Sequence, residues 1–174
     1  AVILRNVFKK GDAWFNTGDL MRDIGCKHAQ FVDRLGDTFR WKGENVSTTE
    51  VESVLGAFPG VEDAVVYGVA INGSDGRCGM AALRLAADST LDAQALAQYL
   101  DGELPVYAAP LFIRLLSELE TTGTFKYKKN DLKQVAYNPA QTSDPLFVRL
   151  PGAKAFQPLD EQLWARIEAG EFRF

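Results

Sequence analysis

The sequence predicts an α+β fold, a small two-layer domain in which a central β-sheet is flanked by helices. Short segments rich in Val, Ile, Leu and Ala alternate with segments in which apolar residues recur at helical spacing, and turn residues separate them. With 174 residues and a hydrophobic content of 47%, the chain is long enough to bury a core. We therefore expect packed strands and helices that include a short antiparallel hairpin.

The first elements expected along the chain are strands, and a turn at residues 15–18 precedes them. The predicted strands are residues 19–23, 28–35 and 38–42, and the first two are joined around Gly25. An amphipathic helix follows. It should begin near Ser47, where Ser47 and Glu50 have capping-box spacing, and it should end before Pro59.

The remaining elements follow from the same two periodicities. Residues 61–71 and 79–86 are predicted to form two antiparallel strands around the loop 72–76, with a helix at 91–103, a strand at 111–116 and a helix at 129–135. Four of the seven prolines lie between Pro139 and Pro158. That stretch is therefore expected to be an extended strap rather than a core element, and a terminal helix should end near Gly170.

Composition excludes several classes of function. The formal net charge of −4 gives no reason to expect nucleic acid as a partner. The two cysteines, Cys26 and Cys78, and the single histidine, His28, have no metal-ligand spacing, so we expect no metal site built from them. No stretch has the length and hydropathy of a membrane span or a secretory signal. We expect a cytoplasmic protein, and peripheral attachment at the inner face of the membrane stays open.

Three segments concentrate charge and glycine beyond what a core requires: residues 14–20, 31–52 and 119–132. In the first, Asp19 follows a Thr-Gly turn, where a carboxylate can accept hydrogen bonds from vicinal hydroxyls such as those of a ribose. An ordinary turn aspartate explains this pattern equally well. The first segment alone is therefore not decisive.

The second segment alternates charged and aromatic residues, which places Arg40 and Lys42 on one face of a strand and Phe39 and Trp41 on the other. A solvated strand face explains those cations. The two glycines of this segment, Gly36 and Gly43, indicate a bend or a close approach of the backbone to another group.

The third segment presents three lysines, Lys126, Lys128 and Lys129, beside several hydroxyls. Such a loop can bring an ammonium group to a phosphate as charge develops during adenylyl transfer, although most lysine-rich loops are simply solvated.

Taken in order, these three segments resemble the C-terminal signature motifs of the adenylate-forming superfamily, which comprises acyl-CoA synthetases, luciferases and peptide-synthetase adenylation domains. The resemblance covers residues 14–132. Residues 36–51 (GDTFRWKGENVSTTEV) resemble in particular the branch of fatty acid transport proteins and very-long-chain acyl-CoA synthetases.

The resemblance implies a two-step reaction with ATP, Mg²⁺, CoA and a fatty acid. The fatty carboxylate attacks the α-phosphate of ATP to give acyl-adenylate and pyrophosphate, and the CoA thiol then displaces AMP. It also implies roles for individual residues. Lys126 steadies the phosphates, Asp19 and Arg34 bind the nucleotide, Gly43, Glu44 and Asn45 line the path of CoA, and Gly36 is the hinge.

Two positions depart from the family pattern. Gly36 stands where many relatives carry an acidic or lysine hinge residue, and glycine can still absorb a backbone change there. Phe125 stands where the family lysine is usually preceded by glycine. Lys128 and Lys129 therefore remain alternatives to Lys126.

We expect residues 1–34 to be the end of a large N-terminal domain, 35–138 a mobile C-terminal lid and 139–174 a strap with a terminal helix. A rotating lid lets one site serve both half-reactions. The chain by itself should be inactive, because the phosphate loop and acyl pocket would precede residue 1. Two other hypotheses stay open, a non-enzymatic interaction module that retains the lid fold and a ligase that loads a carrier protein. A homodimer also stays open.

Overall fold

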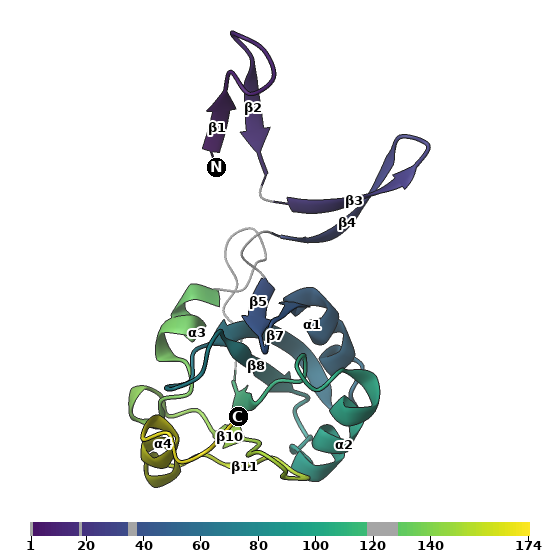
Figure 1. The fold of residues 1–174 in the computed structure, drawn as a ribbon. Coiled ribbons are helices and arrows are strands. Elements are labelled where there is room, and N and C mark those ends of the chain that lie inside the picture. The colour runs from purple at the N-terminus through teal and green to yellow at the C-terminus, as the bar shows by residue number, and fades with distance from the viewer. Residues whose placement is uncertain (1, 18, 35–37, 118–128) are drawn as a thin grey trace. The chain divides into compact units, whose positions relative to one another are not determined.

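The computed structural model describes residues 2–17, 19–34, 38–117 and 129–174. They belong to two compact units, residues 1–38 and residues 39–174 (Figure 1). The expected division into the end of a large domain (residues 1–34), a lid (35–138) and a strap with a terminal helix (139–174) stays a prediction. No helix in the described stretches has the length and apolar character needed to cross a membrane.

The first unit contains two antiparallel hairpins. Strand β1 (Val2–Arg5) pairs with β2 (Ala13–Asn16), and β3 (Asp19–Gly25) pairs with β4 (His28–Arg34). The β3–β4 hairpin is the one expected around Gly25. The β1–β2 hairpin was not expected, and the turn expected at residues 15–18 is wrong at Phe15 and Asn16, which lie in β2 and pair with β1.

Asp12 organises the loop between β1 and β2. Its carboxylate accepts hydrogen bonds from the backbone N–H groups of Val7, Phe8 and Lys9 at 2.9–3.1 Å and from Trp14 Nε1 at 2.8 Å. The hydrogen bond from Trp14 is the main cause that lowers the pKa of Asp12. A loop held by one side chain has no periodic signature in the sequence.

The second unit is built on a five-stranded mixed sheet with the strand order β11-β10-β9-β8-β7. Neighbouring strands run antiparallel except β8 and β9, which run parallel. The strands are β7 (Val61–Val69), β8 (Cys78–Leu85), β9 (Phe112–Leu115), β10 (Leu146–Val148) and β11 (Gln157–Pro158).

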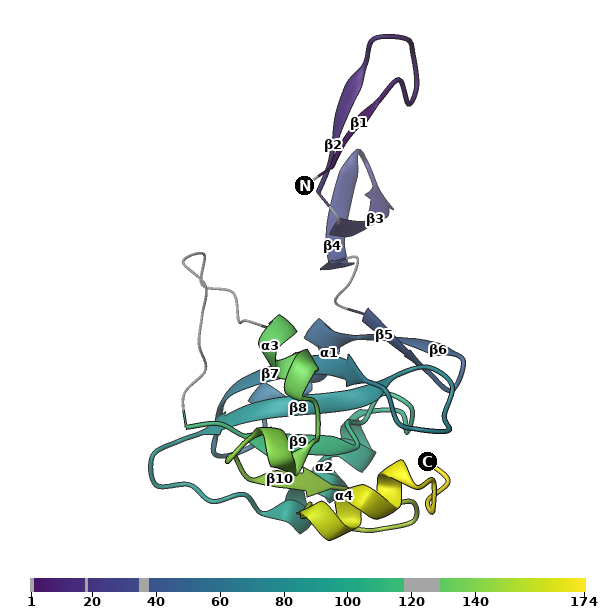
Figure 2. The same ribbon diagram turned by 90° about the vertical axis from the view of Figure 1, so that its left-hand side faces the viewer.

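Helices cover both faces of this sheet. Figures 1 and 2 show α1 and α2 on one face and α3 and α4 on the other. The helices are α1 (Thr48–Gly56), α2 (Ala93–Glu103), α3 (Lys129–Val135) and α4 (Glu161–Glu168), with a 3₁₀ turn at Pro139–Gln141. The expected α+β class, with a central sheet flanked by helices, is confirmed.

Side-chain caps fix where three of the helices begin. Ser47 Oγ accepts the N–H of Glu50, which confirms the expected start of α1. Asp92 caps α2, which therefore starts at Ala93 and not at residue 91, and Asp160 caps α4.

Strands β7 and β8 contribute much of the core. Every residue of β7 from Val65 to Val69 is buried, and so is every residue of β8 from Cys78 to Leu83. Continuous burial of this kind occurs where helices cover both faces of a sheet. Burial also raises the pKa of the Cys78 thiol, so this free cysteine is an inert core side chain.

The expectation that residues 139–158 stay outside the core is wrong at β10. This strand pairs with β9, and both Leu146 and Val148 are buried. A strand of three residues is too short for its alternation to be recognised in a proline-rich stretch. The strap is also fastened to α2, because the Arg149 guanidinium forms two hydrogen bonds of 2.7 Å with the Asp101 carboxylate.

Candidate functional site

Gly43 lies in a tight turn between β5 (Thr38–Trp41) and β6 (Glu44–Ser47). Lys42 and Gly43 are the two turn residues, with φ of 51° and 86°, which is the pattern of a type I′ hairpin turn. The backbone alone therefore accounts for a glycine at this position. Strand β6 was not expected from the sequence, because the capped helix dominates the pattern in that region.

No described atom crowds the β5–β6 turn at Gly43. A Cβ atom added at Gly43 would meet no described atom within 4 Å. Glu44 and Asn45, the two other residues proposed to line the CoA path, follow directly in β6 and are exposed. The structure thus brings these three candidates together on one hairpin.

The base of the β5–β6 hairpin is held tightly. Phe39 and Trp41 are buried while Arg40 is exposed, which confirms the expected alternation. The Arg40 carbonyl accepts the N–H of Arg77 at 2.7 Å. A Cβ atom at Gly76 would lie 2.4 Å from that carbonyl oxygen, so only glycine allows this approach. The hairpin therefore presents its turn from a rigid base.

Asp19 and Arg34, the two candidate nucleotide ligands, are Cα partners in the β3–β4 ladder. They are fifteen positions apart in the sequence, and the hairpin places them side by side.

Lys126, Lys128 and Gly36 lie outside the described residues. Lys129 is described, and its Nζ atom lies 2.9 Å from Glu52 Oε1 and 3.2 Å from Thr48 Oγ1. Glu52 Oε1 also accepts the N–H of Val66 at 2.8 Å. Lys129 thus ties α3 to α1 and β7, and the choice among Lys126, Lys128 and Lys129 stays a prediction.

Sequence reasoning missed this contact between Lys129 and Glu52. The sequence shows only that Glu52 follows the apolar Val51 at the start of the predicted helix. Nothing in the local pattern indicates a partner 77 positions away. Among the residues that the structure describes, no group of three His, Cys, Asp or Glu side chains could hold a metal ion.

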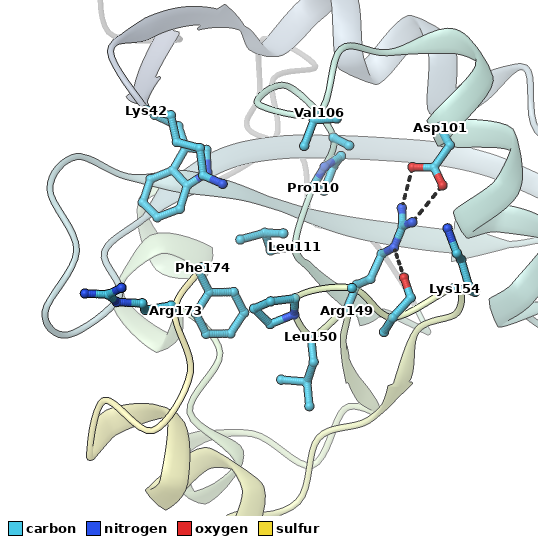
Figure 3. A pocket seen from close by; sticks show the side chains of 15 residues that line it. Lys42, Asp101, Val106, Pro110, Leu111, Arg149, Leu150, Lys154, Arg173 and Phe174 are labelled. Atoms are coloured by element: carbon cyan, nitrogen blue, oxygen red, sulfur yellow. Dashed lines mark hydrogen bonds and ion pairs between the residues drawn. The ribbon is translucent and has the colours of Figure 1, made fainter.

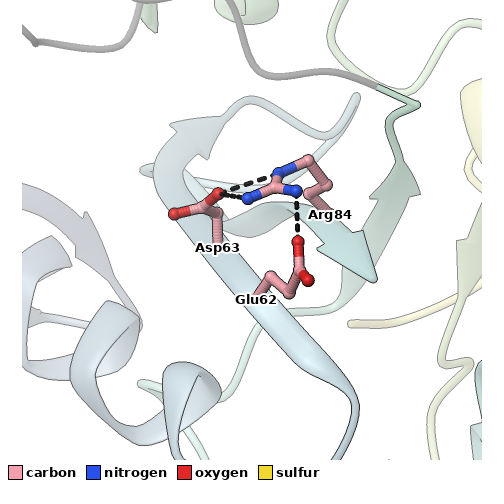
Figure 4. Close-up of polar contacts among 3 residues, drawn as sticks. All are labelled: Glu62, Asp63 and Arg84. Atoms are coloured by element: carbon pink, nitrogen blue, oxygen red, sulfur yellow. Dashed lines mark hydrogen bonds and ion pairs between the residues drawn. The ribbon is translucent and has the colours of Figure 1, made fainter. Parts of the chain in front are cut away.

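A second cluster of charges lies on the edge strand β7 and has a structural explanation. A register shift between Val61 and Asp63 lets both Glu62 and Asp63 reach Arg84 on β8 (Figure 4). Hydrogen bonding to Asp63, with Arg84 Nε at 2.8 Å, is the main cause that raises the pKa of Arg84. This cluster of three charged side chains therefore links β7 to β8.

Comparison with known proteins identifies relatives over most of the chain. The family model of the AMP-binding enzyme C-terminal domain matches residues 50–126. A medium/long-chain-fatty-acid–CoA ligase of Mycobacterium tuberculosis is 54% identical over 146 residues, which are 84% of this chain and 24% of that protein. Long-chain fatty acid transport protein 1 of Mus musculus is 48% identical over 172 residues, 98% of this chain and 26% of that protein. The chain thus spans about a quarter of the length of these curated relatives.

A solved structure shows the same fold. MatB from Rhodopseudomonas palustris, determined with ATP bound, matches with a TM-score of 0.64 and 26% identity over 75% of this chain and 25% of that one. The resemblance inferred from residues 14–132 is confirmed by these relatives. The chain therefore belongs to the AMP-binding enzyme family and carries its C-terminal domain, in the branch of fatty acid–CoA ligases and long-chain fatty acid transport proteins.

Proposed function

We propose that this chain is the C-terminal part of an AMP-forming, ATP-dependent fatty acid–CoA ligase that acts on long- or very-long-chain fatty acids. Such an enzyme forms acyl-adenylate and pyrophosphate from a fatty acid and ATP, and then transfers the acyl group to the CoA thiol with release of AMP. The similarity to a fatty acid–CoA ligase over most of the chain is the observation that carries this proposal.

Different residues act in the two steps of the proposed reaction. In the first, Lys126 steadies the phosphates while charge builds up on the leaving pyrophosphate, and Asp19 and Arg34 hold the nucleotide. The pairing of Asp19 with Arg34 in one ladder supports their joint role. Mg²⁺ would neutralise phosphate charge when bound.

In the second step, the hairpin turn at Gly43 gives the CoA thiol a path along bare backbone, with Glu44 and Asn45 beside it. Gly36 is the hinge about which the lid, residues 35–138, turns between the two steps. The open space around Gly43 supports this role. Because the reaction also needs the large domain, we propose that the chain alone is inactive.

The enzyme would work in the cytoplasm, with fatty acid, ATP and CoA as its small-molecule partners. Peripheral attachment to a membrane and a homodimer are compatible with this proposal, and neither is required by it.

The two half-reactions test these assignments in the longer protein. Lys126→Ala should abolish fatty-acid-dependent pyrophosphate release and largely spare thioester formation from supplied acyl-adenylate. Equal loss of both half-reactions would refute the role of Lys126.

Gly43→Ala should have the opposite effect and slow thioester formation more than pyrophosphate release. Gly73→Ala is the matched control, because Gly73 also has a positive φ, 75°, and open space around it. If both glycine variants slow thioester formation equally, backbone strain explains the effect and the path beside Gly43 is excluded.

A further inference from the structure

Two glycines face each other across the central strands. Gly68 of β7 and Gly79 of β8 are Cα partners in the antiparallel ladder, so they lie on the same side of the sheet. Neither has a positive φ, and the local backbone conformation therefore does not require glycine at either position. With no side chain at this pair, which we call the glycine seat, a neighbouring side chain can approach the backbone of the sheet.

The Phe39 side chain occupies the glycine seat. A Cβ atom added at Gly68 would lie 2.5 Å from Phe39 Cβ, and one added at Gly79 would lie 3.0 Å from Phe39 Cζ. Both ends of the side chain thus rest on core strands, and Phe39 is only 5% exposed. Because these contacts leave no room for a side chain at Gly68, Phe39 is held against the backbone of the sheet itself.

The attachment of β5 to the sheet begins at Phe39. This residue is the first of the second compact unit, which comprises residues 39–174. Thr38, directly before it, is exposed. Two positions after Phe39, Trp41 forms an isolated bridge with Gly76. Phe39 is therefore the point from which the β5–β6 hairpin is fixed relative to β7 and β8.

The glycine seat also meets the segment that follows α2. A Cβ atom at Gly79 would lie 3.2 Å from Pro110 Cα, and the Gly79 carbonyl accepts the N–H of Leu111 at 2.9 Å. Lys42, at the β5–β6 turn, and Pro110 both line a cavity of about 470 Å³ (Figure 3). The place of Phe39 on the sheet therefore sets where the turn stands relative to Pro110.

We propose that Phe39 is a positioning residue for thioester formation. Because its side chain is buried, it acts through the β5–β6 turn, whose place relative to the sheet is fixed by the contacts with Gly68 and Gly79. The inference rests on the proposed function, in which the CoA thiol passes beside Gly43.

The first half-reaction should be much less sensitive to Phe39. The residues proposed for adenylation, Asp19, Arg34 and Lys126, are not on the β5–β6 hairpin. A small shift of this hairpin therefore changes the path of the thiol and leaves the proposed nucleotide contacts in place.

Gly79→Ala in the longer protein tests the proposal, with the two half-reactions assayed separately. The added methyl group displaces Phe39. Since a misplacement of about 1 Å can slow a reaction about a hundredfold, the smaller shift here should lower thioester formation from supplied acyl-adenylate about tenfold relative to pyrophosphate release.

Rescue by a second substitution identifies Phe39 as the cause. Phe39→Leu removes the Cζ atom that the new methyl group would meet. The double variant should therefore recover to within about threefold of the wild-type ratio of the two half-reactions. The contact between residue 79 and Pro110 is the same in the single and the double variant, so it does not affect this comparison.

Two control variants separate positioning from a general loss of stability. Gly102→Ala is the matched glycine control, because Gly102 lies in α2 and an added Cβ atom there would meet no described atom within 4 Å. Leu83→Ala removes a buried side chain from β8, four positions after Gly79. Both should keep the ratio of the two half-reactions within about twofold of wild type, although Leu83→Ala lowers the free energy of unfolding.

Hydrogen exchange followed by mass spectrometry adds a measurement that needs no activity. In Gly79→Ala, the backbone amides of residues 38–47 should exchange about tenfold faster than in the wild type, and in Leu83→Ala their exchange should change no more than that of the rest of the unit. A wild-type protein that forms no acyl-CoA would refute the proposed function. The exchange data would still decide whether Phe39 fixes the hairpin.

Three results would overturn the role of Phe39. The first is an unchanged ratio of the two half-reactions in Gly79→Ala, or equal slowing of both. The second is a lowered ratio that Phe39→Leu does not restore in the double variant. The third is wild-type exchange of residues 38–47 in Gly79→Ala.

Discussion

Gly43 and Gly76 share a left-handed backbone, with φ of 86° and 88°, but their surroundings differ. A Cβ atom at Gly43 would meet open space, and one at Gly76 would lie 2.4 Å from the Arg40 carbonyl oxygen. Gly43→Ala should therefore lower the free energy of unfolding by about 1 kcal/mol, the cost of the backbone alone. Gly76→Ala adds a clash with backbone and should cost about 3 kcal/mol or more.

Urea denaturation of the two variants measures this difference. Equal losses in the free energy of unfolding would mean that the backbone at the base of the β5–β6 hairpin shifts to make room for the added methyl group. The turn at Gly43 would then not be held rigidly.

At the scale of residues, the ion pair between Lys129 and Glu52 is a second contact that stabilises the fold. Both side chains are about one-fifth exposed, at 20% and 21%. Lys129→Met removes the ammonium group from Glu52 and should cost about 2 kcal/mol of unfolding free energy. In the double variant with Glu52→Gln, the loss should be smaller than the sum of the single losses by about 1 kcal/mol, because the two residues interact directly. Additive losses in a double-mutant cycle would contradict a direct interaction.

At the scale of elements, α1 and α3 could be predicted because their signals are local. Ser47 and Glu50 mark the start of α1, and the apolar residues Val51 and Leu55 lie on its buried side. Strands β1, β6 and β10 could not be predicted. Each is fixed by its partner strand or by a loop contact such as that of Asp12, which the residues of the strand itself do not reveal.

The strap depends on a contact that responds to pH. The hydrogen bonds from Arg149 hold the pKa of Asp101 below its unfolded value. The ionised carboxylate therefore contributes stability above the unfolded pKa, about 3.9, and this contribution is lost as the pH falls through the folded value. The effect should be small, since the Asp101 side chain is 46% exposed.

Asp101→Asn isolates this contribution. Between pH about 7 and about 3, the wild-type protein should lose more unfolding free energy than Asp101→Asn. Asp88→Asn, which changes another exposed aspartate, is the control and should follow the wild type. Thermal melts across this range provide the measurement, and parallel curves for the wild type and Asp101→Asn would show that Arg149 does not stabilise the carboxylate.

At the scale of the whole molecule, the family resemblance could be recognised from the sequence more readily than the elements could. The signature residues 36–51 are contiguous, so they could be recognised without knowing how the chain folds. The cavity beside Lys42 could not be recognised in this way. This cavity, lined by Lys42, joins the β5–β6 turn to residues 149–154 and 173–174, which are more than 100 positions away in the sequence.

We infer that this chain belongs to an enzyme that joins a fatty acid to CoA through an acyl-adenylate. The most direct measurement is a product assay of the longer protein with fatty acids of graded length, ATP and CoA. We expect equal amounts of acyl-CoA, AMP and pyrophosphate from a long-chain substrate. Formation of ADP, or acyl transfer to a carrier protein with none to CoA, would contradict it.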